Sequence, residues 1–221
     1  MQQHKSLLGA AALLLVWYSM TGSMRDPNNP PVSRTGAAGE TTCAASGCHN
    51  GGSFTGTVTI SGIPDTVVAN QSYTVTLLHS SNAVRAGFQL TCLDNNNAKC
   101  GTLTSSTGTS IGNNNLLVRQ YIRQSTPKNL SNGAASWTFT WKAPGTAAGN
   151  LAKFYFTSLA ANGNGNNNGD NVLVGTKTVV FPDNSVSTSE PDPKQWMHVY
   201  PTLVQDNELQ VRLLKSNYSF S

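Results

Sequence analysis

Cys43, Cys48 and His49 form a CxxxxCH pattern whose residue types could hold a cofactor. A cysteine pair followed at once by histidine is typical of covalent haem c attachment, because two thiols can bond the haem while the imidazole binds its iron. The familiar spacing has two residues between the cysteines, and this chain has four. Three interpretations stay open: haem c with His49 as axial ligand, a Cys43–Cys48 disulfide, or a metal site.

A second axial ligand for such a haem is not indicated by any motif. The candidates are His79, His198, Met24 and Met197. His79 lies at the end of an expected strand, so we interpret it as a rim residue or a core residue with hydrogen-bond partners. Met197 and His198 follow an expected linker, and packing is the expected role for both.

The other cysteines, Cys92 and Cys100, flank the Asn-rich stretch LDNNNAKCG, which is typical of a turn. An exported chain can form disulfides, so we predict a Cys92–Cys100 disulfide that clamps a hairpin. The loop NGNGNNNGD could suggest a calcium site, but Asp170 is its one carboxylate. Calcium affinity rises with the number of carboxylates, so a hairpin loop is the preferred interpretation.

The N-terminus predicts export. Residues 1–23 read as a signal peptide, because the apolar run LLGAAALLLVWY is too short to span a bilayer, and no transmembrane span is expected in the mature chain. Charged residues make up 11% of the chain, against roughly 25% in average proteins. The 14 basic and 10 acidic residues form no basic stripe, so nucleic acid is not an expected partner.

Residues 24–54 lack a hydrophobic period and are expected to form an irregular arm that lies outside the folded domain. Residues 55–181 then alternate apolar and polar side chains in short runs. In ASWTFTWKAPG, Trp137, Phe139 and Trp141 are predicted to face the core, and NNNLLVRQYIRQ (113–124) is predicted as a strand. The fold class expected from this pattern is all-β, an antiparallel β-sandwich of two sheets.

Residues 182–195 contain three prolines and are expected to be a linker. Within residues 196–221, the stretch VYPTLVQDNELQVRL contains apolar residues in alternation with polar ones. The sequence then ends at the beginning of another apparent strand. We therefore expect a partial, truncated C-terminal β module.

The stretches GTVTISGIPDTVVANQSYTVTL, RAGFQL and SWTFTWKAPGTAAGNLAKFYFTSLAANGNG together resemble the Reeler domain family, in its bacterial form called choice-of-anchor V. TGAAGETTCAASGCHNGG is similar to the segment that precedes this domain in bacterial members. Residues 196–221 resemble the start of a type IX secretion (Por-type) sorting domain, with Thr202 where that family has Asn. The resemblance implies a secreted, immunoglobulin-like antiparallel β-sandwich on a bacterial cell surface, with secretion and anchoring machinery as partners of the tail.

No catalytic constellation is found, because the sequence has no G-x-S-x-G elbow and no paired acid and base in a recognisable motif. We therefore expect a non-enzymatic module of the adhesion type, which binds an unknown surface ligand or matrix polymer. The alternative is a surface electron-transfer protein similar to c-type cytochromes.

Overall fold

The structure is a computed structural model that describes residues 27–45 and 47–182. The expected signal peptide, Met24, the sorting module with Met197 and His198, and the linker beyond Pro182 lie outside the described residues. Within the described part, the chain folds into two sheets that face each other, so the all-β expectation is confirmed. The one helical element there is a short 3-10 turn, η2 (Ala148–Asn150).

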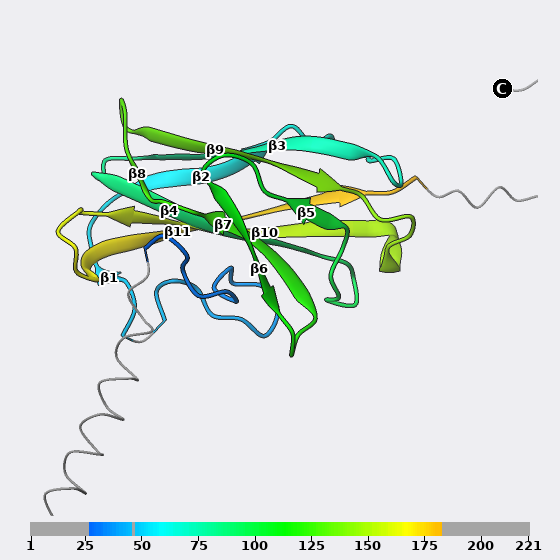
Figure 1. Ribbon diagram of the computed structural model, residues 1–221, viewed down its shortest axis with the longest axis horizontal. Helices are drawn as coiled ribbons and strands as arrows, with labels where there is room; N and C mark the ends of the chain where they lie inside the picture. Colours follow the sequence, from blue (N-terminus) through cyan, green and yellow to red (C-terminus); the bar gives the residue numbers. More distant parts are fainter. Residues whose placement is uncertain (1–26, 46, 183–221) are drawn as a thin grey trace, which may run out of the picture. The chain divides into compact units, whose positions relative to one another are not determined.

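The larger sheet has the strand order β1-β11-β10-β4-β7-β6, with β8 beside β4, and the smaller sheet has the order β2-β3-β9-β5. The strands of the larger sheet are β1 (Asn50–Gly51), β4 (Arg85–Leu93), β6 (Thr109–Asn114), β7 (Arg119–Gln124), β8 (Lys128–Asn129), β10 (Leu151–Ala161) and β11 (Asn168–Val180). Those of the smaller sheet are β2 (Gly56–Ser61), β3 (Ser72–Ser81), β5 (Thr102–Thr104) and β9 (Ala134–Lys142). Figure 1 shows β2, β3 and β9 of the smaller sheet as the upper layer, with β10 and β11 in the layer below them.

The interior between the sheets is aromatic, as the alternation on β9 predicts. Trp137, Phe139 and Trp141 are each at most 1% exposed. The ring of Trp141 packs against the ring of Phe154, which lies in the opposite sheet. The two rings are arranged edge to face, with their centroids 5.0 Å apart. Because aromatic side chains bury large apolar areas and add pairwise attraction, this cluster holds the two sheets together.

The strands are not all antiparallel. The short strand β1 pairs with β11 in parallel, and it joins the N-terminal arm to the edge of the larger sheet. The predicted strand at 113–124 is also wrong in its first part. Asn115–Val118 form the turn between β6 and β7, and the strand begins at Arg119. The three apolar residues at this position have the sequence pattern of a buried strand. The three asparagines that precede them are typical of a turn.

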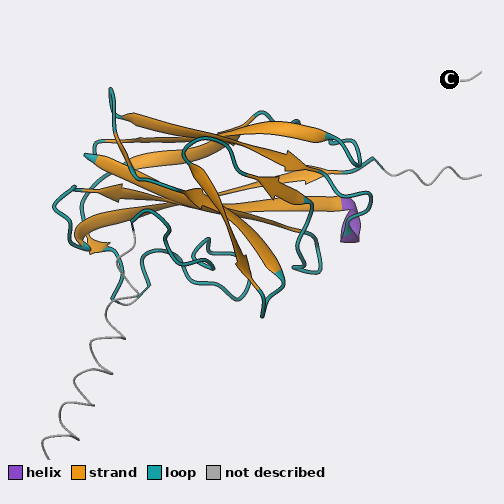
Figure 2. Cartoon of the chain, in the orientation of Figure 1, coloured by secondary structure: helices purple, strands orange, loops and turns teal. Residues whose placement is uncertain are grey.

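The N-terminal arm is irregular, as expected, but it does not hang free. Figure 2 shows it as loops beside the larger sheet. The backbone N–H of Arg34 donates to Gln89 Oε1 at 2.8 Å, and Gln89 Nε2 donates to the carbonyl of Pro31 at 2.9 Å. Thr157 Oγ1 donates to the Arg34 carbonyl at 3.0 Å. Polar side chains on the outer face of the sheet therefore bind the arm backbone.

No helix among the described residues is long and apolar enough to cross a membrane.

Candidate functional site

The CxxxxCH segment is closed by its own backbone. The N–H of His49 donates to the carbonyl of Cys43 at 3.0 Å, and the N–H of Cys48 donates to the carbonyl of Ala45 at 2.8 Å. Ala44, Ala45 and Gly47, which lie between the cysteines, are in turns and bends. The four-residue spacing therefore does not separate the backbones of Cys43 and His49, which stay hydrogen-bonded to each other.

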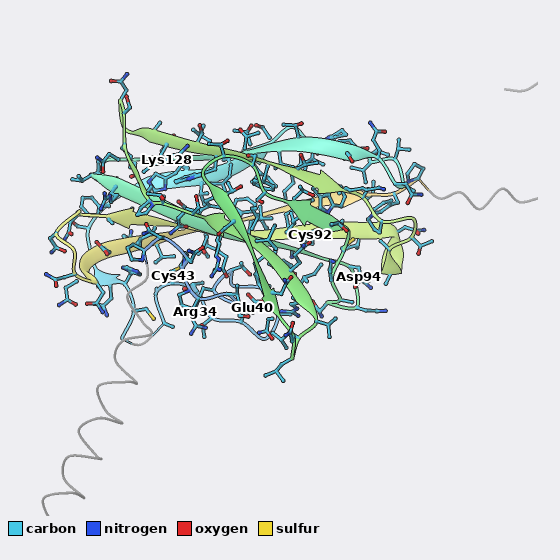
Figure 3. The ribbon with its side chains drawn as sticks, viewed as in Figure 1. Arg34, Glu40, Cys43, Cys92, Asp94 and Lys128 are labelled. Atoms are coloured by element: carbon cyan, nitrogen blue, oxygen red, sulfur yellow. The ribbon has the colours of Figure 1, made fainter. Side chains whose placement is uncertain are left out.

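The two thiols of this loop lie in different surroundings. Cys43 Sγ lies 3.7 Å from the Thr157 hydroxyl and 3.9 Å from the Arg34 carbonyl oxygen, so it faces β10. Burial raises the pKa of the Cys43 thiol, and the hydrogen bond with Thr157 offsets part of this rise. Cys48 is half-buried, and the structure has both cysteines as free thiols. Figure 3 shows Cys43 on the arm side of the larger sheet, near Arg34 and Glu40.

His49 is held by a buried carboxylate. Its Nδ1 lies 2.7 Å from Asp170 Oδ2, and the side chains of His49 and Asp170 are 34% and 2% exposed. A carboxylate accepts hydrogen bonds, so Nδ1 carries a proton, and in the neutral imidazole the lone pair is then on Nε2. A carboxylate behind a histidine in this way fixes the ring and its tautomer for binding a metal through the other nitrogen.

The sheet edge places Asp170 beneath the arm. Asp170 lies near the start of β11, and its Oδ1 accepts the N–H of Asn162, at 3.0 Å, from the other side of the β10–β11 loop. Its carbonyl accepts the N–H of Gly52 at 2.9 Å. A Cβ on Gly52 would lie 2.5 Å from the Asp170 carbonyl carbon, so glycine is required for this approach. The sequence reading considered Asp170 for calcium and missed its contact with His49.

Glu40 anchors the arm, and sequence reasoning missed this role too. Its carboxylate accepts from Arg119 Nη1 at 2.8 Å, from the Tyr121 hydroxyl at 2.6 Å, and from the Thr35 hydroxyl at 2.7 Å. The Glu40 side chain is 0% exposed and that of Arg119 is 6% exposed. Burial and the hydrogen bond to Glu40 raise the pKa of Tyr121 to about 12. Glu40 comes three residues before Cys43, so this network fixes the start of the CxxxxCH loop.

Both ring nitrogens of His79 are engaged inside the protein, so His79 is not available as an axial ligand. It is fully buried, with Nδ1 2.8 Å from Ser158 Oγ and Nε2 2.7 Å from Ser81 Oγ. This agrees with the interpretation of His79 as a core residue with partners. Burial lowers its pKa.

Two other expectations concern metals and the second cysteine pair. Within residues 27–45 and 47–182, no group of three or more His, Cys, Asp or Glu side chains could hold a metal ion. Cys92 and Cys100 are both buried free thiols, joined by a 2.9 Å hydrogen bond from the Cys100 N–H to the Cys92 carbonyl. Burial raises the pKa of Cys92 well above its ordinary value, and the thiol of Cys100 contributes to this rise. Their disulfide stays a prediction.

No family model matches the chain, and no curated protein matches it. Among solved structures, the chain is similar to a human F-spondin reeler domain, at 18% identity and a TM-score of 0.40, over 60% of this chain and 91% of that one. A Reelin-N domain of F-spondin gives 20% identity and 0.41, over 61% and 90%. A cohesin module from a Clostridium perfringens family 33 glycoside hydrolase gives 16% and 0.41, over 57% and 96%.

Proposed function

We propose that the chain is an exported, non-enzymatic β-sandwich module of a bacterial cell surface, and that its arm carries one covalent haem c. The observation that supports the haem is the pairing of the half-buried imidazole of His49 with the buried carboxylate of Asp170. A disulfide between Cys43 and Cys48 would not need a histidine at the next position, nor a buried carboxylate behind it. A metal-binding histidine needs such a partner to fix its tautomer.

Each residue of the site has a separate role in this proposal. Cys43 and Cys48 would hold the group through thioether bonds, and Nε2 of His49 would bind the iron. Haem would supply one-electron chemistry. One exposed apolar residue lies near this loop, because Thr157, which contacts Cys43, pairs in register with Val174, which is 56% exposed. Asp170 positions His49 and adds a negative charge behind the imidazole.

The module is proposed to bind a surface ligand or matrix polymer, with electron transfer to a surface partner as the alternative activity. A binding role is favoured over catalysis at His79, because its buried ring is hydrogen-bonded to the buried Ser158 and the half-buried Ser81 and is not presented to a substrate. The tail at 196–221 is proposed to engage secretion and anchoring machinery.

The haem is tested by producing the full chain in cells that carry a cytochrome c maturation system and recording its pyridine haemochrome spectrum. We expect one haem for each chain. The matched control is Cys92→Ser/Cys100→Ser, which removes two thiols inside the sandwich and should keep the haem band. Cys43→Ser/Cys48→Ser should lose it. An unmodified chain without haem, or equal haem content in the two double variants, would contradict the proposal.

The binding role is tested separately with the same full chain on an array of surface polysaccharides and matrix polymers. Retention on one polymer class by both the haem-loaded chain and Cys43→Ser/Cys48→Ser would support an interaction module that does not depend on haem. No retention on any polymer, together with electron exchange between the loaded chain and an electrode, would favour the electron-transfer alternative.

A further inference from the structure

The turn between β6 and β7 exposes three apolar side chains in succession. We call Asn115–Val118 the hairpin tip. Leu116 is 95% exposed, Val118 is 74% exposed and Leu117 is 42% exposed. In Figure 1 this hairpin projects beyond the strands of both sheets, with its tip pointing away from the sandwich. Scattered single apolar residues are normal on a surface, but a projecting group of three has a binding function more often.

The hairpin tip is held in one conformation. Asn114 Oδ1 accepts the N–H groups of Leu116 and Leu117 at 3.0 and 3.1 Å. Val118 has a φ of 51°, which is an outlier for a β-branched residue. Such backbone strain is typical of functional loops. Below the tip, Arg119 is fixed by Glu40 and by the carbonyls of Ala38 and Asn97. A rigid projection loses little conformational entropy when it binds.

The size of the hairpin tip decides between its possible occupants. A stable protein–protein interface buries about 800 Å² on each partner, and three side chains on a narrow turn fall short of this area. Binding to a lipid bilayer does not need a minimum interface area. Its strength increases with the apolar area that enters the boundary between headgroups and acyl chains.

The charges near the hairpin tip agree with a lipid surface. A shallow hollow at its base is lined by Lys99, Asn113, Asn114, Asn115, Val118, Arg119 and Gln120, and none of these is acidic. Arg119 is paired with Glu40, so the charge argument rests on Lys99, which is exposed. A lysine close to a bilayer is attracted to anionic headgroups. We propose that the hairpin tip inserts Leu116 and Val118 into the surface of a lipid bilayer and so holds the module against a membrane. This inference does not depend on the haem.

The experiment measures co-sedimentation of the exported chain with vesicles of phosphatidylcholine and phosphatidylglycerol, after mass spectrometry has defined its N-terminus. Leu116→Asn/Val118→Asn is the test variant, because asparagine is polar and tolerates the left-handed backbone of residue 118. Burial of each apolar side chain gives roughly a tenfold gain in partitioning, so we expect the double variant to bind about 100-fold more weakly.

The matched control is Val68→Asn/Val84→Asn, which changes two valines that are each 57% exposed and lie outside the hairpin. Its vesicle binding should equal that of the unmodified chain. As a direct readout, the fluorescence of Leu116→Trp should shift to the blue when vesicles are added. Failure of the unmodified chain to bind vesicles, an equal loss in both double variants, or self-association that only the tip variant abolishes would overturn the proposal.

Discussion

Replacing Glu40 by alanine should loosen the arm and destabilise the fold. The change removes one partner from an ion pair whose side chains are 0% and 6% exposed, a loss that costs about 3–5 kcal/mol. Arg119 keeps hydrogen bonds to the carbonyls of Ala38 and Asn97, so we expect a value near the lower end, about 3 kcal/mol. For a chain of this size, that corresponds to a fall in Tm of about 10 °C.

The assay is urea unfolding followed by tryptophan fluorescence, since Trp137 and Trp141 are buried, together with hydrogen exchange of the arm amides. Asp65→Ala is the matched control, because it removes a carboxylate that is 89% exposed from an ion pair with Lys177. Exposed pairs contribute little, so no measurable change is expected there. If Glu40→Ala unfolds at the same urea concentration as Asp65→Ala and keeps its arm amides protected, the arm is not anchored as described.

Three further predictions concern His79, the site histidine and the sheet edge. Burial holds the pKa of His79 below its ordinary 6.5. As the pH falls, His79 is therefore protonated at a higher pH in the unfolded chain than in the folded one. Stability should therefore fall as the pH drops below 6.5, and less so in His79→Gln; equal pH dependence in both would contradict this. In the haem-loaded chain, Asp170→Asn should raise the reduction potential without changing haem content, because a negative charge behind His49 is lost; an unchanged potential by spectroelectrochemistry would exclude that role. Gly52→Ala should expose the β1 amides to hydrogen exchange, because its Cβ would lie 2.5 Å from the backbone of Asp170, whereas Gly145→Ala, with its nearest contact at 3.4 Å, should not.

The interior of the sandwich could be predicted from the sequence, because the alternation of apolar and polar residues along a strand shows which side chains share a face. Side chains two residues apart on a strand share a face, so Trp137, Phe139 and Trp141 had to be buried together once one of them was. The same reasoning failed at Leu116–Val118. An apolar run does not reveal whether it lies in a strand or in the turn that joins two strands.

The contacts of the site could not be predicted, because they join residues far apart in the chain. His49 and Asp170 are separated by 121 positions, and Glu40 and Tyr121 by 81. Local patterns indicate element type and face, but they carry no signal for such a pair. The arm was expected to lie outside because it lacks hydrophobic periodicity, whereas polar groups on β4, β7 and β10 hold it through its backbone.

A covalent haem on the CxxxxCH loop would add a fixed mass to the chain. It is therefore detected by the intact mass of the exported chain from cells with a cytochrome c maturation system. We predict the mass of the chain plus one haem, with Cys43 and Cys48 both protected from alkylation under reducing conditions. A mass without haem, together with two cysteines that become alkylated only after reduction and map to positions 43 and 48, would contradict it.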